Sequence, residues 1–525
     1  MPWECAACTM INENDAFLAC ATCGTQRATQ KRTLEDKDGA AAKRTCIDLC
    51  GSDDDDEVAC LGSQGGATPA APAATAAPAA YAWRPLYCTS LGAASPGNRG
   101  AVSIADVAMG RPKFVVISNY MISGGWLARA WPALRDVERV VVFHGEARTA
   151  RDLQGLFPRA EIHDMTPKKL EFLHAGTGRP FKNDWGCHHS KFFLVGLEDS
   201  LRVAVHTANL IPTDWDHKSQ GIWMQEFPPK APAAAGACDF EDALCRYVDT
   251  LQVHAGGAAR NWRGFGCAFD DAPVMDLAAA LRHFDFSGAR GRLVTSAPGY
   301  HMGADLHAFG MNRVAKLLAE APARGREGDE IICNFSSFSK PSQKLLDSLG
   351  DSFAADRAPR APLRLVWPTS DEVRRSSEGY AAGGCMPSYA KNVDLAPRDL
   401  LRKWVSGAGD DYVRARRTAM PHVKTWSRIS ADGADVRWSF LTSSNLSGGA
   451  HGARQKNDSQ LFVMHWEMGI LYVGDAKTTA SAAAGDVVVP LHFACPPAPY
   501  AAGDLPFKWD VDFETPDRFG RHGTH

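Results

Sequence analysis

The sequence lacks both a long hydrophobic run and a leader-like N-terminus. No stretch of the 525 residues reaches the roughly 20 consecutive apolar residues that a membrane-spanning helix requires. The first residues, Met1 to Glu4, lack the charged-then-apolar pattern of a secretory signal. We therefore expect no membrane association and no secretion.

Cysteines are present, but they are not arranged as a disulfide framework. Of the 15 cysteines, four cluster near the N-terminus, and the others are scattered singly among apolar residues. This usage is typical of reduced thiols in an intracellular protein. Small disulfide-stabilised domains are therefore excluded as a class.

A strong net charge is also missing, although the charge is unevenly distributed. Residues 1–80 carry 6 Lys and Arg against 12 Asp and Glu, whereas residues 81–525 carry 51 against 48. The tail is therefore acidic and the body mildly basic. This balance permits a local phosphate-binding groove but does not demonstrate one.

Apolar patterning predicts an α/β body from residue 81 onward. The expected strands are 114–118, 139–143, 191–195, 201–206, 292–295, 331–335, 363–367, 438–442 and 461–465. Helical stretches intervene, as at 240–251 and 306–319, so each half is an α/β layered unit. A Gly-containing loop at 287–291 divides an N-terminal half, 81–289, from a C-terminal half, 290–525.

Two short segments far apart in the chain carry the same signature, one from His189 to Lys191 and one from His422 to Lys424. Each is followed by a predicted strand that leads to an asparagine, Asn209 or Asn445. Alternate side chains of a strand share a face, so the histidine and the lysine are expected to point together. Two such half-sites facing each other would hold a phosphodiester from both sides.

Two further polar residues follow the asparagines. Gln220 lies 11 residues after Asn209, and Glu467 lies 22 after Asn445. Polar groups that enter an apolar strand usually orient a neighbour, here the imidazoles. A single His-x-Lys pattern is weak evidence for a catalytic site, because it can arise by chance. Two copies, each followed by a similar strand and an asparagine, are hard to explain as structural features alone.

These segments resemble the tyrosyl-DNA phosphodiesterase family of the phospholipase D superfamily, from about Tyr87 to Trp509. The similarity lies in residues 187–191, 201–211, 214–215, 218–223, 378–380, 383–384, 420–425 and 442–447. Ordinary phospholipase D enzymes carry an aspartate five residues after the motif lysine, where this chain has Gly196 and Ile429. That difference favours the phosphotyrosyl-DNA branch over lipases, cardiolipin synthases and simple nucleases.

The resemblance implies two similar phospholipase D-like α-β-α halves with mixed sheets, related by a pseudo-twofold axis. It assigns His189 as the nucleophile and His422 as the general acid and then the base. The groups that would neutralise the phosphate oxygens are Lys191, Lys424, Asn209 and Asn445. Gln220 and Glu467 resemble the histidine-orienting residues. No carboxylate cluster suited to two metals accompanies the motif, so catalysis without a metal cofactor is expected.

The resemblance also suggests substrate contacts. Tyr120 matches a tyrosine that packs on a DNA base, although a core tyrosine is the alternative. Ser336, Ser337 and the loop 377–384 resemble contacts to the phosphate backbone. Trp509 is expected on the peptide side of the groove. His188 and His206 are interpreted as structural.

Residues 1–27 predict a small zinc finger. Its ligands would be the two Cys-x2-Cys pairs, Cys5 with Cys8 and Cys20 with Cys23. A segment this short cannot bury enough core alone, so zinc would supply the folding free energy. With Trp3 and Asn12 it resembles the Ran-binding-protein fingers, which bind ubiquitin or single-stranded RNA; the ligand stays open.

Residues 28–80 predict a disordered linker with an acidic run at 53–57 and an Ala/Pro tract at 67–80. The basic pairs at 31–32 and 43–44 resemble a bipartite nuclear-import signal, with chance pairing as the alternative. Residues 46–50 beside the acidic run resemble a SUMO-interacting motif, with a solvated acidic tail as the alternative.

The sequence thus favours a monomeric nuclear DNA-repair enzyme that removes tyrosyl peptides from single- or double-stranded DNA 3′ ends. Topoisomerase adducts would be its substrates. One alternative is a broader phospholipase D-type nuclease or esterase. Another is a ubiquitin- or SUMO-reading scaffold with a vestigial catalytic fold, against which the two intact His-x-Lys-Asn sets argue.

Overall fold

The computed structural model describes residues 3–4, 11–12, 80–231, 238–255, 276–322, 324–356, 359–405 and 410–524. At the N-terminus, β1 (Trp3–Glu4) pairs antiparallel with β2 (Ile11–Asn12). The predicted zinc ligands Cys5, Cys8, Cys20 and Cys23 lie outside the described residues, as does the predicted linker except for Ala80. Within the described residues no helix is long and apolar enough to cross a membrane.

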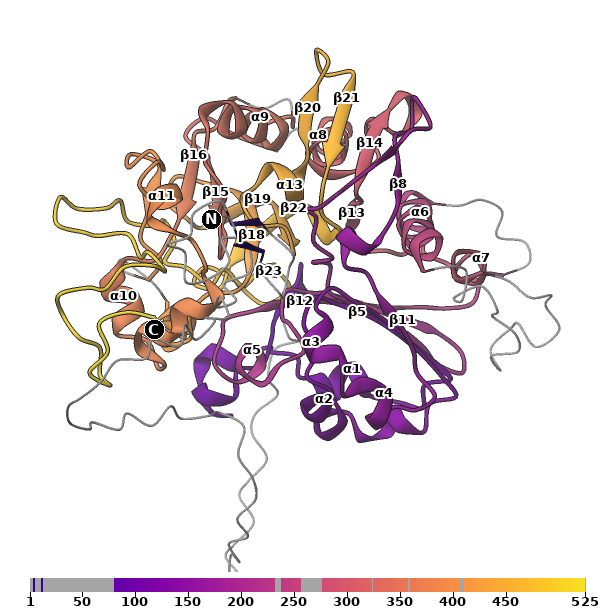
Figure 1. The fold of residues 1–525 in the computed structure, drawn as a ribbon. Helices are drawn as coiled ribbons and strands as arrows, with labels where there is room; N and C mark the ends of the chain where they lie inside the picture. Colours follow the sequence, from indigo (N-terminus) through magenta and orange to yellow (C-terminus); the bar gives the residue numbers. More distant parts are fainter. Residues whose placement is uncertain are drawn as a thin grey trace, which may run out of the picture. The chain divides into compact units, whose positions relative to one another are not determined.

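The first of two large sheets has seven strands in the order β4-β12-β11-β10-β5-β6-β7 (Figure 1). Their bounds are β4 (Arg84–Pro85), β5 (Phe114–Asn119), β6 (Arg139–His144), β7 (Glu161–Asp164), β10 (Phe192–Gly196), β11 (Leu201–His206) and β12 (Gly221–Phe227). The pairs β5/β6 and β6/β7 are parallel, whereas the pairs from β5 through β10, β11 and β12 to β4 are antiparallel. The sheet is therefore mixed.

Both faces of the first sheet are buried. Val115 and Ile117 of β5 belong to one apolar cluster with Leu127, whereas the alternate residue Val116 belongs to a second cluster with Leu244. This alternation is what a pleated strand produces when helices cover both faces. The covering helices include α1 (Ile104–Ala108), α2 (Gly124–Ala130), α4 (Leu153–Leu156), α6 (Asp239–His254) and α7 (Leu277–Leu281).

The second sheet has nine strands, in the order β17-β16-β15-β18-β19-β22-β23-β3 with β13 also pairing with β22. Their bounds are β3 (Ala80–Tyr81), β13 (Arg292–Ser296), β15 (Glu330–Asn334), β16 (Leu363–Val366), β17 (Leu401–Arg402), β18 (Lys424–Ile429), β19 (Asp435–Thr442), β22 (Glu467–Thr478) and β23 (Val487–Val489). Helices of this half include α8 (Gly310–Glu320), α9 (Gln343–Phe353), α10 (Ser370–Arg374), α12 (Asp411–Arg416) and α13 (Gly448–His451).

The two sheets repeat one topology. The run β12-β11-β10-β5-β6-β7 corresponds strand for strand to β22-β19-β18-β15-β16-β17. In both runs the first three pairings are antiparallel and the last two are parallel. The chain is therefore an α/β protein with two mixed sheets of equivalent order.

The predicted strands are confirmed, with small shifts at their ends, and so are helices α6 and α8. The strand predicted at 461–465 is β21 (Gln460–Val463), which lies in a separate three-stranded sheet with β14 (Gly299–Met302) and β20 (Ala453–Gln455). The strand expected at 191–195 begins one residue later. β3 lies at the start of the first half in sequence but joins the second sheet.

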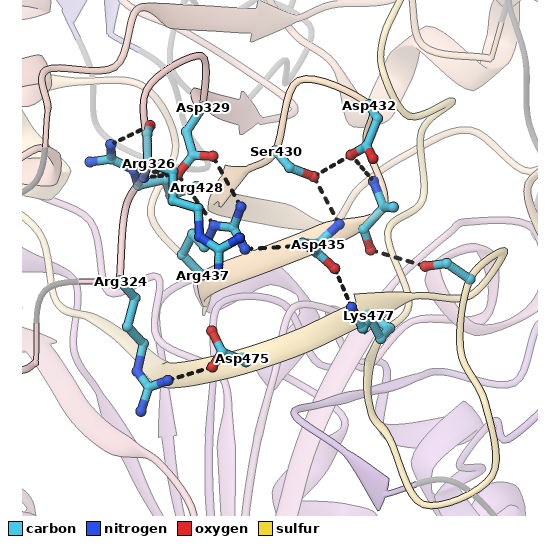
Figure 2. Close-up of polar contacts among 12 residues, drawn as sticks. Arg324, Arg326, Asp329, Arg428, Ser430, Asp432, Asp435, Arg437, Asp475 and Lys477 are labelled. Atoms are coloured by element: carbon cyan, nitrogen blue, oxygen red, sulfur yellow. Dashed lines mark hydrogen bonds and ion pairs between the residues drawn. The ribbon is translucent and has the colours of Figure 1, made fainter.

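A buried ion-pair network braces strands β18 and β19 (Figure 2). The fully buried Arg428 guanidinium contacts Asp329 at 3.1 Å and Asp356 at 2.8 Å. Arg437 of β19 contacts the same Asp329 at 3.3 Å. The network ties the loops that carry the two aspartates to the central strands of the second sheet.

Candidate active site

The two histidines lie immediately before equivalent strands, β10 and β18, and each is held by the other half. The His189 backbone N–H donates to the Trp466 carbonyl at 2.9 Å. The His422 N–H donates to the Ser219 carbonyl at 3.0 Å. Trp466 and Ser219 each precede the polar residue, Glu467 or Gln220, that was expected to orient a histidine. The docking of the halves therefore brings each orienting residue to the histidine of the opposite half.

His189 is paired with a buried carboxylate. Its Nδ1 lies 3.1 Å from Glu467 Oε2, and the Ser443 hydroxyl donates to the same carboxylate oxygen. Because an ionised carboxylate only accepts hydrogen bonds, it favours a proton on Nδ1. Nε2 is then left with its lone pair, as a nucleophile requires.

His422 has two partners at the equivalent nitrogen. Its Nδ1 lies 2.9 Å from Gln220 Nε2 and 3.0 Å from Asp214 Oδ2. Asp214 belongs to α5 (Pro212–Asp216), in the connection between β11 and β12. Asp214 lies in a segment, 214–215, that contributed to the family resemblance, but it was not predicted to be a site residue. Only the folded structure shows that it reaches His422.

The two asparagines are fixed in different ways. Asn445 Oδ1 accepts from the backbone N–H groups of Ser336 and Ser337, both at 3.1 Å, and from the Ser336 hydroxyl at 3.2 Å. With its oxygen engaged, the Asn445 amide can present only its NH2 group as a further polar contact. Asn209 is held through its backbone N–H, which donates to Asp214 Oδ2 at 2.6 Å.

The two lysines are fully buried, and neither is among the residues that line the two cavities of the site. Lys191 Nζ donates to the His189 carbonyl at 2.8 Å, and Lys424 Nζ donates to the His422 carbonyl. Burial lowers the pKa of Lys191 to about 8, with Glu467 opposing the shift. Burial and the neighbouring Lys191 lower the pKa of Lys424 to about 7.

These groups surround two adjoining cavities. The larger, of about 400 Å³, is lined by both histidines, both asparagines, Tyr120, Asp214, Lys218, Ser336, Ser337, Glu378 and Cys385, among others. The second, of about 330 Å³, is lined by Trp185, Lys391, His465 and Glu467, among others. His189, Cys187, Ser337 and Asn445 line both, so the predicted nucleophile stands between them.

Comparison with known proteins identifies the family of the chain. The family profile described as tyrosyl-DNA phosphodiesterase matches residues 87–501. The chain belongs to the tyrosyl-DNA phosphodiesterase family. It is therefore an enzyme, a phosphodiesterase.

Relatives in plants and animals share most of the chain. Tyrosyl-DNA phosphodiesterase 1 of Arabidopsis thaliana is 33% identical over 475 residues, covering 81% of this chain and 74% of that protein. The protein of the same name in Drosophila melanogaster is 26% identical over 459 residues, covering 81% and 73%. A crystal structure of yeast tyrosyl-DNA phosphodiesterase has the same fold, with a TM-score of 0.57 at 14% identity, covering 82% of this chain and 99% of that one.

The electrostatics of this phosphodiesterase keep both imidazoles neutral near pH 7 in the absence of substrate. Burial, assisted by Lys191, lowers the pKa of His189 to about 4, although Glu467 opposes the shift. Burial likewise lowers the pKa of His422 to about 4, although Asp214 opposes it. A phosphodiester bound in the cavity would bring negative charge to the histidines and raise the pKa of both.

Both carboxylates are ionised at neutral pH. Burial would raise the pKa of Glu467, but His189 and its other neighbours outweigh it and lower the pKa to about 2. Burial would also raise the pKa of Asp214, but His422, the Asn209 N–H and Lys424 lower it to about 2. Each histidine therefore has one negatively charged neighbour at Nδ1.

Of the predicted substrate contacts, Tyr120, Ser336 and Ser337 line the larger cavity, whereas Trp509 does not. The Tyr120 ring lies 5.8 Å from the His189 ring, centroid to centroid, and lines the larger cavity. Ser336 and Ser337 also line it, but their backbone N–H groups are engaged by Asn445. Trp509 is not among the residues that line these two cavities; it is buried and packs edge-on against Tyr389. His188 and His206 are buried and line neither cavity.

Proposed function

We propose that this enzyme hydrolyses the bond between a tyrosine and a DNA 3′ phosphate through a covalent phosphohistidine. The observation that supports this most directly is the pair of histidines on one cavity, each with Nδ1 held by the opposite half of the chain. Topoisomerase-derived tyrosyl peptides on single- or double-stranded 3′ ends would be the substrates. The enzyme would act as a monomer in the nucleus.

In the first step, the Nε2 lone pair of His189 attacks phosphorus and displaces the tyrosyl oxygen. His422, protonated at Nε2 once the phosphodiester is bound, transfers that proton to the departing oxygen. In the second step His422 takes a proton from water, which attacks the phosphohistidine and releases His189 and a 3′ phosphate. Splitting the displacement into two steps lets one pair of histidines serve both.

Hydrogen-bond donors and positively charged groups around the phosphate would stabilise the transition states. The Asn445 amide, whose oxygen is already engaged, would donate to a phosphate oxygen, and Asn209 would act from the other half. The Lys191 and Lys424 ammonium groups, held by the carbonyls of the two histidines, would supply positive charge. We propose that this set makes catalysis independent of a metal ion.

The decisive assay is a 3′-phosphotyrosyl oligonucleotide incubated with the full-length enzyme in excess chelator. We expect release of a 3′-phosphate end, and we expect His189→Ala to abolish it. His307→Ala is the matched control, because His307 is exposed and lines neither cavity. Internal cleavage of the oligonucleotide, hydrolysis of lipid instead, or no turnover would refute the proposal and favour a broader esterase or a scaffold.

For the tail we propose a zinc finger over residues 1–27 that recruits a partner, with SUMO or ubiquitin contact through the tail. The support is the paired spacing of Cys5, Cys8, Cys20 and Cys23. The catalytic body would consist of the halves 81–289 and 290–525 related by a pseudo-twofold axis, joined to the finger by the linker 28–80. Elemental analysis should find one zinc per chain in the full-length protein and none in Cys5→Ser/Cys20→Ser; zinc-free wild type would exclude the finger.

A further inference from the structure

The polar connections to the two histidines are equivalent, position by position. Gln220 directly precedes β12, and Glu467 begins the corresponding strand β22. Each accepts a hydrogen bond from a hydroxyl two residues before the motif asparagine, Thr207 for Gln220 and Ser443 for Glu467. The repeat therefore delivers a carboxylate to His189 but only a neutral amide to His422.

The orientation of the Gln220 amide follows from its neighbours. The Gly221 N–H donates to the Thr207 hydroxyl at 3.0 Å. Thr207 then donates its own proton to Gln220 Oε1, 2.6 Å away. The Gln220 NH2 group consequently faces His422, so this residue can only donate to Nδ1.

A single ring nitrogen cannot satisfy both Gln220 and Asp214 in the same protonation state. An unprotonated Nδ1 would accept from Gln220, whereas a protonated Nδ1 donates to the Asp214 carboxylate. The first arrangement leaves the ionised Asp214 facing a lone pair. The second places two N–H groups near each other but engages the carboxylate.

The proposed reaction requires the second arrangement throughout. As the acid, His422 carries protons on both nitrogens; as the base, it needs its lone pair on Nε2, so its one proton must be on Nδ1. In neither state does Nδ1 have a lone pair for Gln220.

We propose that Asp214 is the positioning residue that holds a proton on His422 Nδ1 through both steps, in place of the carboxylate missing at Gln220. This inference rests on the proposed function of His422. Asp214 also accepts from the Asn209 backbone N–H, so it couples the geometry of the acid–base histidine to an amide of the other half. The charged groups that face His422 are Asp214, Lys424 and Lys191, of which only Asp214 favours the imidazolium.

The test compares wild type, Asp214→Asn, Gln220→Glu and the double variant on two 3′-aryl oligonucleotides. One carries tyrosine and the other p-nitrophenol, a far better leaving group that needs little protonation. For Asp214→Asn we expect release of tyrosine to slow by about 10²–10⁴-fold, and release of p-nitrophenol by less than about tenfold. The covalent adduct should accumulate from both substrates, because water still needs a base.

Rescue distinguishes positioning from a structural contribution. In Asp214→Asn/Gln220→Glu, a carboxylate returns to Nδ1 from the position equivalent to Glu467, with Thr207 still able to donate to it. We expect the double variant to recover at least about tenfold in tyrosine release over Asp214→Asn. Equal losses on both substrates with no rescue would overturn the proposal, since loss of the Asn209 contact alone predicts that result.

A measurement on the wild-type enzyme tests the proposal even if a variant fails to fold. Nitrogen-15 spectra of histidine-labelled enzyme, with His422 assigned by its disappearance in His422→Asn, report the tautomer directly. We expect Nδ1–H with Nε2 unprotonated near pH 7. The opposite tautomer would overturn the Asp214 proposal. Undiminished turnover in His422→Ala would instead refute the proposed function.

Discussion

At the level of single residues, the chemistry of this site depends on which ring nitrogen of each histidine carries a proton. Glu467 accepts from His189 Nδ1, so the nitrogen that is left for phosphorus keeps its lone pair. Burial keeps the imidazoles neutral until substrate arrives. In the proposed mechanism, a bound phosphodiester would supply the negative charge that allows His422 to become an acid.

Loss of the second histidine should trap the intermediate. In His422→Ala, His189 still attacks, but more slowly, because the tyrosyl oxygen is no longer protonated as it leaves. No base then activates water, so a covalent DNA adduct should accumulate while overall turnover falls by about 10²–10⁴-fold. Denaturing gels of a labelled 3′-phosphotyrosyl oligonucleotide measure both quantities. The double variant His189→Ala/His422→Ala is the control and should form no adduct. Reduced turnover without any adduct in His422→Ala would contradict the acid–base assignment.

At the level of elements, the site is assembled from equivalent ends of equivalent strands. β10 and β18 begin three and two residues after their histidines, and each asparagine lies three residues beyond the end of β11 or β19. Strand β18 buries several polar side chains, among them Lys424 and Arg428. Lys424 donates to the His422 carbonyl, whereas Arg428 is paired with Asp329 (Figure 2) and with Asp356.

Removing Arg428 should therefore destabilise the second sheet. Arg428→Ala would leave Asp356 without its buried partner and Asp329 with Arg437 as its remaining ion-pair partner. We expect this to lower the free energy of unfolding by about 3–5 kcal/mol. Chemical denaturation measures this cost. Arg360→Ala is the matched control, because the Arg360–Asp351 pair is exposed and should contribute less than about 1 kcal/mol. Equal effects of the two substitutions would show that the network does not brace the sheet.

At the level of the whole molecule, one apolar cluster contains side chains from both sheets. Val116 and Leu194 of the first sheet and Trp426 and Leu471 of the second belong to it. Such a shared core predicts that the described halves unfold together rather than independently. It also holds the two histidines, which depend on bonds across the halves, at a constant separation.

Stability should fall as the pH drops below about 6.5. Burial lowers the pKa values of five histidines to about 3 or about 4: His188, His189, His206, His422 and His451. Between those values and 6.5 the unfolded chain binds more protons than the folded one, so the free energy of unfolding increases with pH. Denaturation at pH 7.5, 6 and 5 should show the loss.

His206→Leu provides the matched test of this cause. The His206 ring stacks on Phe193 with centroids 5.0 Å apart, in a site where an apolar side chain suits the surroundings. Removing one depressed pKa should reduce the pH dependence between 6.5 and 5 while leaving stability at pH 7.5 nearly unchanged. An unaltered slope would mean that buried histidines do not control acid stability.

Most of the strand positions could be predicted from sequence, because runs such as 114–117 and 192–195 are apolar throughout. The ranges of strands β12, β18 and β22 were not predicted, although strand geometry was expected around Gln220, Lys424 and Glu467. β18 contains Lys424 and Arg428, whose burial depends on partners elsewhere in the chain, and β22 is interrupted by Gly469 and Gly474. Patterning registers local burial and therefore misses strands whose polar residues are satisfied by distant groups.

The paired His-x-Lys segments and the asparagines that follow them could be read from the sequence alone, because strand periodicity is a local property. The partner of each histidine could not. Glu467 lies 278 residues from His189, and Gln220 lies 202 from His422, so these bonds exist only once the sheets dock. Asp214 reaches His422 because the connection between β11 and β12 turns back over the cavity, and that placement was decided by the tertiary structure.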